Sequence, residues 1–289
     1  MSRGLTSSAL LALTPAWLAY GWLILRAQWF WAHWPDLEFG WIVLLLCAYL
    51  FWEACPPPLP LEPRIRWLAV TLFVVGVGLM FIFQIYQVAM GVSPASLAGL
   101  ALGALAIAGA NLDFLWGLQG LRRFLFPFAF MLIAMPMPSL VYGPVIGSLQ
   151  HVIASVNVEV LNLVGIPAHR IGNLIQLPTC TVGVEEACSG IRSLQSTLMA
   201  TAFVGMVSLK GPGFRATLIV CGILLALLGN VARSLFLSYA AHQTGGAGVE
   251  TVHATAGWSI LLFTVAGTAL AGWLLHCMEQ RASQSAAGQ

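Results

Sequence analysis

The chain has 289 residues, of which 59% are hydrophobic and only 8% carry a charge. Soluble domains average roughly 25% charged residues, so this composition excludes an ordinary soluble protein and indicates several membrane-spanning segments. A formal net charge of +2 argues against a surface that binds nucleic acid.

Long apolar runs follow one another along the chain, divided by short loops with proline, glycine and charge. A spanning helix needs about 20 mostly apolar residues. Runs of this kind lie at residues 8–25, 39–54, 67–90, 96–118, 124–140, 189–209, 216–240 and 253–277. The fifth contains Pro127, Pro136 and Pro138, which kink a spanning helix. We predict an all-α integral membrane protein, a polytopic bundle of about eight transmembrane helices in a single domain over residues 1–289.

The loops between these runs differ in their content of lysine and arginine. With a cytoplasmic N-terminus, the inner loops contain Arg3, Arg64, Arg66, Arg122, Arg123, Lys210, Arg215 and Arg281. The outer loops then contain only Arg26 and Arg170. Because cytoplasmic loops are enriched in lysine and arginine, the sequence predicts that both termini are cytoplasmic.

Residues 141–187 form the longest stretch between convincing spans, and this orientation places them outside. The part from Val145 to Val164 is apolar but contains several polar residues, namely Gln150, His151, Asn157, Glu159 and Asn162. This mixture predicts an amphipathic helix on the outer surface or packed over the bundle. From Ile171 to Pro178 polar and apolar residues alternate, which favours a hairpin or an extended lid.

A polar motif, residues 184–193, lies at the mouth of the sixth predicted span. Its polar members include Glu185, Glu186, Cys188, Ser189 and Arg192. Such groups are costly in lipid and therefore usually functional there. The free amides at a helix start favour a thiolate, so Cys188 is the candidate nucleophile. Arg192 lies one turn further along the same helix face as Cys188. Glu185 and Glu186 are acids favoured at a helix start, or they take a direct part in the site.

Two later polar residues fall in the outer half of the membrane beside this motif. Arg233 lies about 9 Å outward of the seventh span's centre, at about 1.5 Å rise per residue, and His253 begins the eighth span. Thiolate attack on a carbonyl gives a thioester, and a histidine, with its pKa near neutrality, transfers protons. A guanidinium stabilises an oxyanion or a thiolate, or binds a substrate carboxylate. Asn230 and Ser234 flank Arg233 at helical spacing and are candidates to orient it.

The motifs around Cys188, Arg233 and His253 resemble those of the exosortase/archaeosortase family. Residues 186–194, EACSGIRSL, are similar to the family's cysteine motif, and residues 230–233, NVAR, to its arginine motif. His253 followed by Gly257 resembles its histidine motif. The resemblance extends upstream through residues 165–178 and covers about residues 120–277, which would be the catalytic part.

The resemblance implies a cysteine protease or transpeptidase, similar to a sortase, in the bacterial cytoplasmic (inner) membrane, with its site facing the periplasm or exterior. Cys188, Arg233 and His253 take the catalytic positions. The implied substrate is an exported protein with a C-terminal sorting signal: a Pro-Glu-Pro-like motif, a transmembrane helix and a basic end. The cleaved protein would be transferred to a surface glycan or lipid. Both substrate and enzyme are held among membrane lipids, which lowers the entropic cost of their meeting.

Other interpretations of the same residues stay open. Arg192, Arg233 and His253 would also suit a transporter in which they line an anion or proton path, although no internal repeat supports it. Arg233 is alternatively a buried structural partner of Glu185, Glu186 or Glu250. Cys180 lies eight residues before Cys188, and the oxidising outer compartment permits a disulfide between them. A prenyl-protein protease fits poorly, because Arg192 comes two positions too late after the glutamates. Serine proteolysis through Ser189 is disfavoured beside a better nucleophile.

The histidine, cysteine and acidic residues of the sequence are not spaced as the ligands of a metal site. The sequence also contains no phosphate-binding loop motif. We therefore expect no metal and no cofactor.

Overall fold

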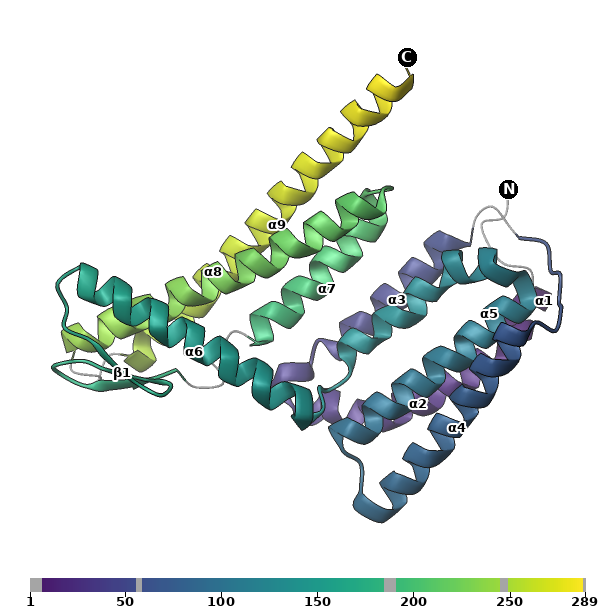
Figure 1. Cartoon of the computed structure of the whole chain (residues 1–289), viewed down its shortest axis with the longest axis horizontal. Coiled ribbons are helices and arrows are strands. Elements are labelled where there is room, and N and C mark those ends of the chain that lie inside the picture. Colours follow the sequence, from purple (N-terminus) through teal and green to yellow (C-terminus); the bar gives the residue numbers. More distant parts are fainter. Residues whose placement is uncertain (1–6, 56–58, 185–190, 245–248, 288–289) are drawn as a thin grey trace. The chain divides into compact units, whose positions relative to one another are not determined.

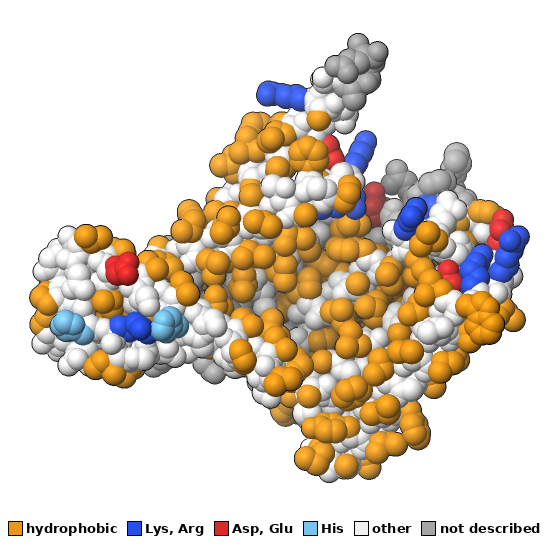
Figure 2. Space-filling model, in the orientation of Figure 1, with side chains coloured by type: hydrophobic (Ala, Val, Ile, Leu, Met, Phe, Trp, Pro, Cys, Tyr) orange, Lys and Arg blue, Asp and Glu red, His pale blue; other side chains and the backbone are white. Residues whose placement is uncertain are grey.

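The structure, a computed structural model, describes residues 7–55, 59–184, 191–244 and 249–287 (Figure 1). It consists of two compact units, Met1–Val141 and Tyr142–Gln289. Hydrophobic side chains cover most of the visible helix sides in each unit (Figure 2). Among the described residues, six helices are long and apolar enough to cross a membrane. This confirms the prediction of a polytopic membrane protein built mainly of helices.

Unit 1 is built around one long helix. Its elements are α1 (Ser7–Ala12), α2 (Thr14–His33), η1 (Pro35–Leu37), α3 (Gly40–Ala54), α4 (Trp67–Met90), α5 (Pro94–Phe130) and η2 (Met131–Ala134). Helices α2, α3 and α4 all pack against α5. In its most apolar window, the segment of α5 and η2 is 72% buried, against 11% for α4. The apolar side chains of α4 therefore face mainly outward.

Small residues let α4 and the first part of α5 approach closely. A Cβ atom added at Gly76 would lie 2.8 Å from the Gly103 carbonyl oxygen, and one at Gly99 would overlap the ring of Phe83. Membrane helices use such small residues to bring their backbones together. The two helices are antiparallel, since Gly99 meets Phe83 while Gly109 meets Leu72.

Helix α5 is divided at Gly117, whose φ of 63° and ψ of −155° are essentially restricted to glycine. The part after Gly117 packs against α3, where the rings of Phe51 and Phe124 have centroids 5.5 Å apart. The part before it packs against α4. The two parts overlap the predicted fourth and fifth spans, and the division at Gly117 lies two residues before the predicted loop at 119–123.

We expect Gly117→Ala to destabilise the protein by about 1–3 kcal/mol, because a Cβ atom makes this backbone conformation costly. Thermal unfolding of the detergent-solubilised protein measures the loss. Gly147→Ala is the matched control: Gly147 lies in a helix with no atom near its added Cβ. That change should be neutral or slightly stabilising. Equal stability of the two variants would contradict the strain at Gly117.

Two loops predicted to be cytoplasmic lie at the same end of unit 1. The guanidinium of Arg66 donates hydrogen bonds to the carbonyl oxygens of Asp113 and Phe114, and that of Arg123 donates to the Ala54 carbonyl oxygen. The 62–66 segment and the turn at Gly117 are thereby joined. This common end agrees with the predicted loop pattern, while its side of the membrane stays a prediction.

Unit 2 combines a small sheet with four helices. Its elements are α6 (Ser139–Leu163, which begins just before the unit boundary), β1 (His169–Ile171), β2 (Leu174–Gln176), β3 (Thr181–Gly183), α7 (Ile191–Ser208), α8 (Pro212–Thr244) and α9 (Val249–Ala287). The strands form an antiparallel sheet in the order β1-β2-β3. This confirms the predicted hairpin, whose first turn uses Gly172 at a φ of 62°.

One face of the sheet packs against α6 and α8. Ile175, Leu177 and Val184 are buried in a cluster with residues of α6. Val231 and Leu235, which flank Arg233 on α8, pack against the same cluster. The sheet is therefore attached to the part of α8 that carries the arginine motif.

Helices α7, α8 and α9 form a three-helix bundle (Figure 1). A Cβ atom at Gly222 would meet Thr201 of α7, and one at Gly229 would lie 3.0 Å from Ile260 of α9, so α8 fits tightly between its neighbours. At one end, the carboxylate of Glu279 accepts hydrogen bonds from the backbone N–H groups of Lys210 and Gly211. This ties α9 to the loop between α7 and α8.

The six candidate spans differ from the eight predicted ones for identifiable reasons. Helix α4 coincides with the predicted span at 67–90. Helices α2 and α7 are not among the six, because their polar residues lower the mean hydropathy. Helix α5 and η2 count as one segment, and α6 is added as a candidate. The number of spans therefore stays a prediction.

The boundary between the fifth predicted span and the outer segment was wrong. The predicted span reached residue 140, whereas η2 ends at Ala134 and α6 begins at Ser139. Pro136 and Pro138 lie in the gap, where proline removes backbone donors and restricts the preceding residue. The predicted amphipathic helix therefore begins six residues earlier than Val145. Its location on the membrane surface stays a prediction.

Candidate functional site

A cavity of about 390 Å³ lies between α7, α8 and α9. Its polar lining consists of Ser193, Ser196, Thr197, Asn230, Arg233, Thr264 and Thr268. Gly257 and several aliphatic side chains complete the wall. Arg233, from the predicted arginine motif, is the one charged residue among the described lining residues. The other described lining residues are neutral.

The cavity lies at the helix positions that the sequence singled out. Ser193 is near the start of α7, and Gly257 is near the start of α9. Arg233 and Asn230 face them from α8; Asn230 is only 3% exposed, and Arg233 is half-buried. The fold therefore brings the arginine motif and the glycine of the histidine motif to one pocket.

Several predicted site residues lie outside the described residues, namely Glu185, Glu186, Cys188 and Ser189. Cys188 precedes Ser193 by five residues, a contour of at most about 18 Å. For Arg192 and His253 the structure describes the helical backbone alone. His253 is four residues before Gly257 in α9, about 6 Å along the axis and on the same face.

Asn157 is a buried residue of the site region that the sequence did not single out for this role. Its side-chain amide donates a hydrogen bond to Ser234 Oγ over 2.7 Å. Asn157 is fully buried and Ser234 is 6% exposed. Ser234 directly follows Arg233, so this bond fixes α6 to the arginine motif. In the sequence, only the polar residues of the 145–164 stretch pointed to a role for Asn157. They did not identify Ser234 as its hydrogen-bond partner.

We expect Asn157→Leu to lower the stability of the protein by about 1–3 kcal/mol, because Ser234 then loses its buried partner. Thermal unfolding in detergent measures the change. Ser155→Ala on the same helix is the control, since the Ser155 hydroxyl donates only to the local His151 carbonyl oxygen. If both variants unfold at the wild-type temperature, the bond does not hold α6 to α8.

Cys180 bears on the disulfide that the sequence left open. It is a free thiol in the turn before β3, and its Sγ donates to the Ala241 carbonyl oxygen of α8 over 3.5 Å. Thr179 Oγ1 also donates to the carbonyl oxygen of His242 over 3.2 Å. Cys180 therefore helps to attach the sheet to α8. Its candidate disulfide partner Cys188 lies outside the described residues.

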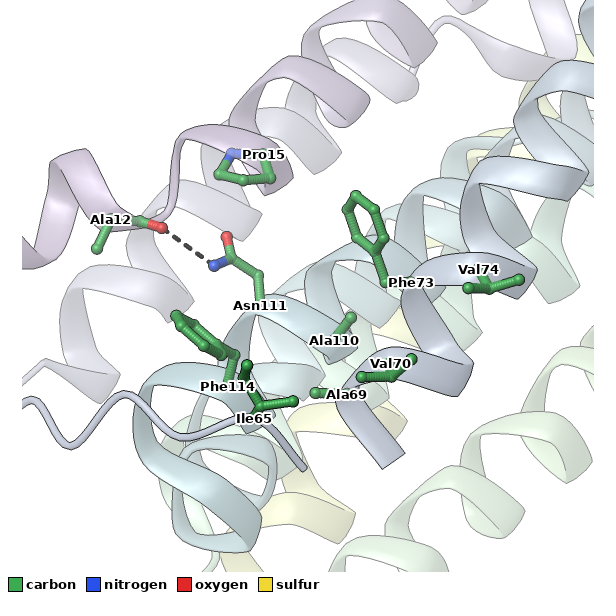
Figure 3. Close-up of a pocket in the computed structure, with 10 residues that line it drawn as sticks. All are labelled: Ala12, Pro15, Ile65, Ala69, Val70, Phe73, Val74, Ala110, Asn111 and Phe114. Carbon is green, nitrogen blue, oxygen red and sulfur yellow. Dashed lines mark hydrogen bonds between the residues drawn. The ribbon is translucent and has the colours of Figure 1, made fainter. Parts of the chain in front are cut away.

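Unit 1 contains a separate cavity of about 400 Å³ with a different character (Figure 3). Asn111, whose side-chain amide donates to the Ala12 carbonyl oxygen over 3.0 Å, is its single side chain with a polar group. The remaining lining is apolar, including Phe73 and Phe114. None of the candidate catalytic residues that the structure describes lines this cavity.

The part of the chain that the structure describes contains no group of three or more histidine, cysteine, aspartate or glutamate side chains placed to hold a metal ion.

The model of a family described as transmembrane exosortase matches residues 31–270, which is most of the chain and includes all three motifs. This confirms the resemblance found in the motifs. Neither the curated proteins nor the solved structures give a match.

Proposed function

The chain is a member of the transmembrane exosortase family, and we propose that it is a membrane cysteine peptidase or transpeptidase that processes exported proteins. The observation that carries this proposal is the cavity lined by Arg233 and Gly257. The cysteine motif leads into one wall of this cavity, and the histidine motif belongs to another. On this support we assign Cys188 as nucleophile, Arg233 as cation and His253 as proton carrier to this pocket.

In the proposed first step, the Cys188 thiolate attacks the carbonyl carbon of the scissile peptide bond. The C–N bond then breaks, leaving a thioester on Cys188. His253 takes the thiol proton and gives it to the departing amine. Arg233 donates hydrogen bonds to the oxyanion as its charge develops, and buried Asn230 supports it from one turn away. Glu185, Glu186, Ser189 and Arg192 are supporting or substrate-binding residues.

The second step releases the acyl group from Cys188. An acceptor nucleophile, supplied by water or by a surface glycan or lipid, attacks the thioester carbonyl and regenerates the thiol. The proposed substrate carries a C-terminal sorting signal with a motif, a transmembrane helix and a basic end. Reaction on the periplasmic or outer side of the cytoplasmic membrane follows from the predicted orientation.

The experiment that tests this function is processing of an exported reporter that ends in such a sorting signal. We expect co-expression with the wild-type enzyme to shorten the reporter by its C-terminal segment, as seen by gel shift and mass spectrometry. A reporter whose signal has lost its motif should stay intact. Failure of the wild-type enzyme to process reporters with signals from its own host would contradict the proposal.

A further inference from the structure

Strand β3 is an edge strand that leads directly toward the cysteine motif. The sheet order is β1-β2-β3, and no other strand of the described residues pairs with the outer side of β3. Residue Gly183 ends the strand, five positions before Cys188. An edge strand exposes backbone donors and acceptors that can pair with another extended chain.

The hydrogen-bond pattern identifies which backbone groups face that outer side. Leu177 N–H donates to the Cys180 carbonyl oxygen over 2.8 Å, and Val184 N–H donates to that of Asn173 over 3.0 Å. Hydrogen-bonded pairs alternate along an antiparallel ladder. The pair between them, Ile175 and Val182, is therefore also hydrogen-bonded.

It follows that Val182 directs its N–H and C=O groups toward β2, while Thr181 and Gly183 direct theirs away from it. Within the described residues, no hydrogen bond to the backbone of Thr181 or Gly183 is found. Two residues of β3 thus offer an unpaired row of donors and acceptors beside the cysteine motif.

Gly183 is a second, independent sign that another chain comes close to the backbone of β3. Its φ is not positive, so its backbone conformation does not require glycine. A glycine inside a strand often marks a place where a ligand or another backbone comes close. The sheet is also held firmly, because Val182 packs into the cluster with Val231 and Leu235 of α8.

From these observations we infer that β3 binds the substrate by strand addition. The occupant is the extended segment of the exported protein around its scissile bond, which lies outside the membrane beside the substrate's own helix. Its backbone pairs with Thr181 and Gly183, which aligns the scissile carbonyl with the cysteine motif. Main-chain pairing of this kind supplies affinity, while side-chain pockets supply specificity. This inference rests on the proposed function.

The first test uses the wild-type enzyme and a synthetic peptide with the sorting motif of the processed reporter. Single backbone amides of the peptide are replaced by esters, which removes one N–H group at a time. We expect kcat/KM to fall about five- to tenfold at every second residue, since one hydrogen bond is lost at each. Esters without effect, or effects without alternation, would overturn strand addition.

The second test removes a donor from the enzyme. Thr181→Pro deletes an outward N–H group and leaves the bonds of Val182 to β2, and proline is tolerated on a strand edge. We expect kcat/KM to fall about tenfold. Arg170 directs its N–H outward from the opposite edge, and its guanidinium also donates to the Gly172 carbonyl oxygen. Arg170→Pro is therefore the control when it is compared with Arg170→Ala, and the two variants should agree within about twofold. A fall for Thr181→Pro no larger than that from Arg170→Ala to Arg170→Pro would overturn the inference.

Failure of this inference is distinguishable from failure of the proposed function. If the wild-type enzyme cleaves the peptide and Cys188→Ala does not, the function stands whatever the ester scan shows. Thr181→Val keeps the backbone N–H, so its loss of kcat/KM should be smaller than that of Thr181→Pro, which separates a backbone effect from a side-chain effect. Loss of activity in Thr181→Val as large as in Thr181→Pro would count against backbone pairing.

Discussion

Replacing Cys188 with alanine is expected to lower processing of the exported reporter by at least about a thousandfold. Loss of a catalytic nucleophile costs this much or more in enzymes whose chemistry depends on it. The thioester cannot form without the sulfur, and neither hydrolysis nor transfer can follow. The measurement is the rate of reporter cleavage at matched amounts of membrane-inserted enzyme.

Two other cysteines provide matched controls for this change. Cys221 lies on α8 and Cys277 lies on α9, both half-buried free thiols. Cys221→Ala and Cys277→Ala should keep near-normal processing. Full processing by Cys188→Ala would contradict the nucleophile assignment. If that variant also kept an anion or proton flux of the wild-type protein, the residues would serve transport instead.

Replacing Arg233 with lysine is expected to lower kcat about a hundred- to a thousandfold, the usual effect of losing one preorganised oxyanion donor. Lysine keeps the charge but cannot reproduce the planar fork of the guanidinium. Arg233 lies in the cavity wall, where α7 and α9 pack against α8. Single-turnover cleavage of the reporter peptide measures the effect on chemistry.

The same substitution at the other end of α8 is the control. Arg215 donates through Nε to the Leu209 carbonyl oxygen over 2.8 Å, far along the helix from the cavity. Arg215→Lys should process the reporter at close to the wild-type rate. Near-normal activity of Arg233→Lys would show that a point charge is sufficient and would contradict an oriented arginine.

The sequence predicted those parts of the fold that depend on continuous apolar runs. The span at 67–90 coincides with α4, because it contains no proline and no charged residue and Gly91 follows it with a φ of 81°. Alternation from Ile171 to Pro178 likewise predicted the hairpin of β1 and β2. Both patterns involve residues that are neighbours in the sequence, so they can be recognised without knowledge of the tertiary structure.

Tertiary relations were not predictable in the same way. The hydrogen bond from Asn157 to Ser234 joins residues 77 positions apart, and no local pattern pairs them. The start of α6 was missed because the glycines and prolines between residues 136 and 147 weaken a helical pattern that packing later supports. At the site, the motifs identified Asn230 and Arg233, whereas the lining by Thr197, Thr264 and Thr268 depends on how three helices pack.

The most direct test of the central claim is to trap the acyl-enzyme. Purified enzyme is mixed with the reporter peptide, quenched in acid during turnover and digested for mass spectrometry. We predict an adduct on Cys188 with the mass of the peptide's N-terminal fragment, which hydroxylamine removes as expected for a thioester. An adduct on Ser189 or Cys180 instead, or turnover without any covalent adduct, would contradict a mechanism through Cys188.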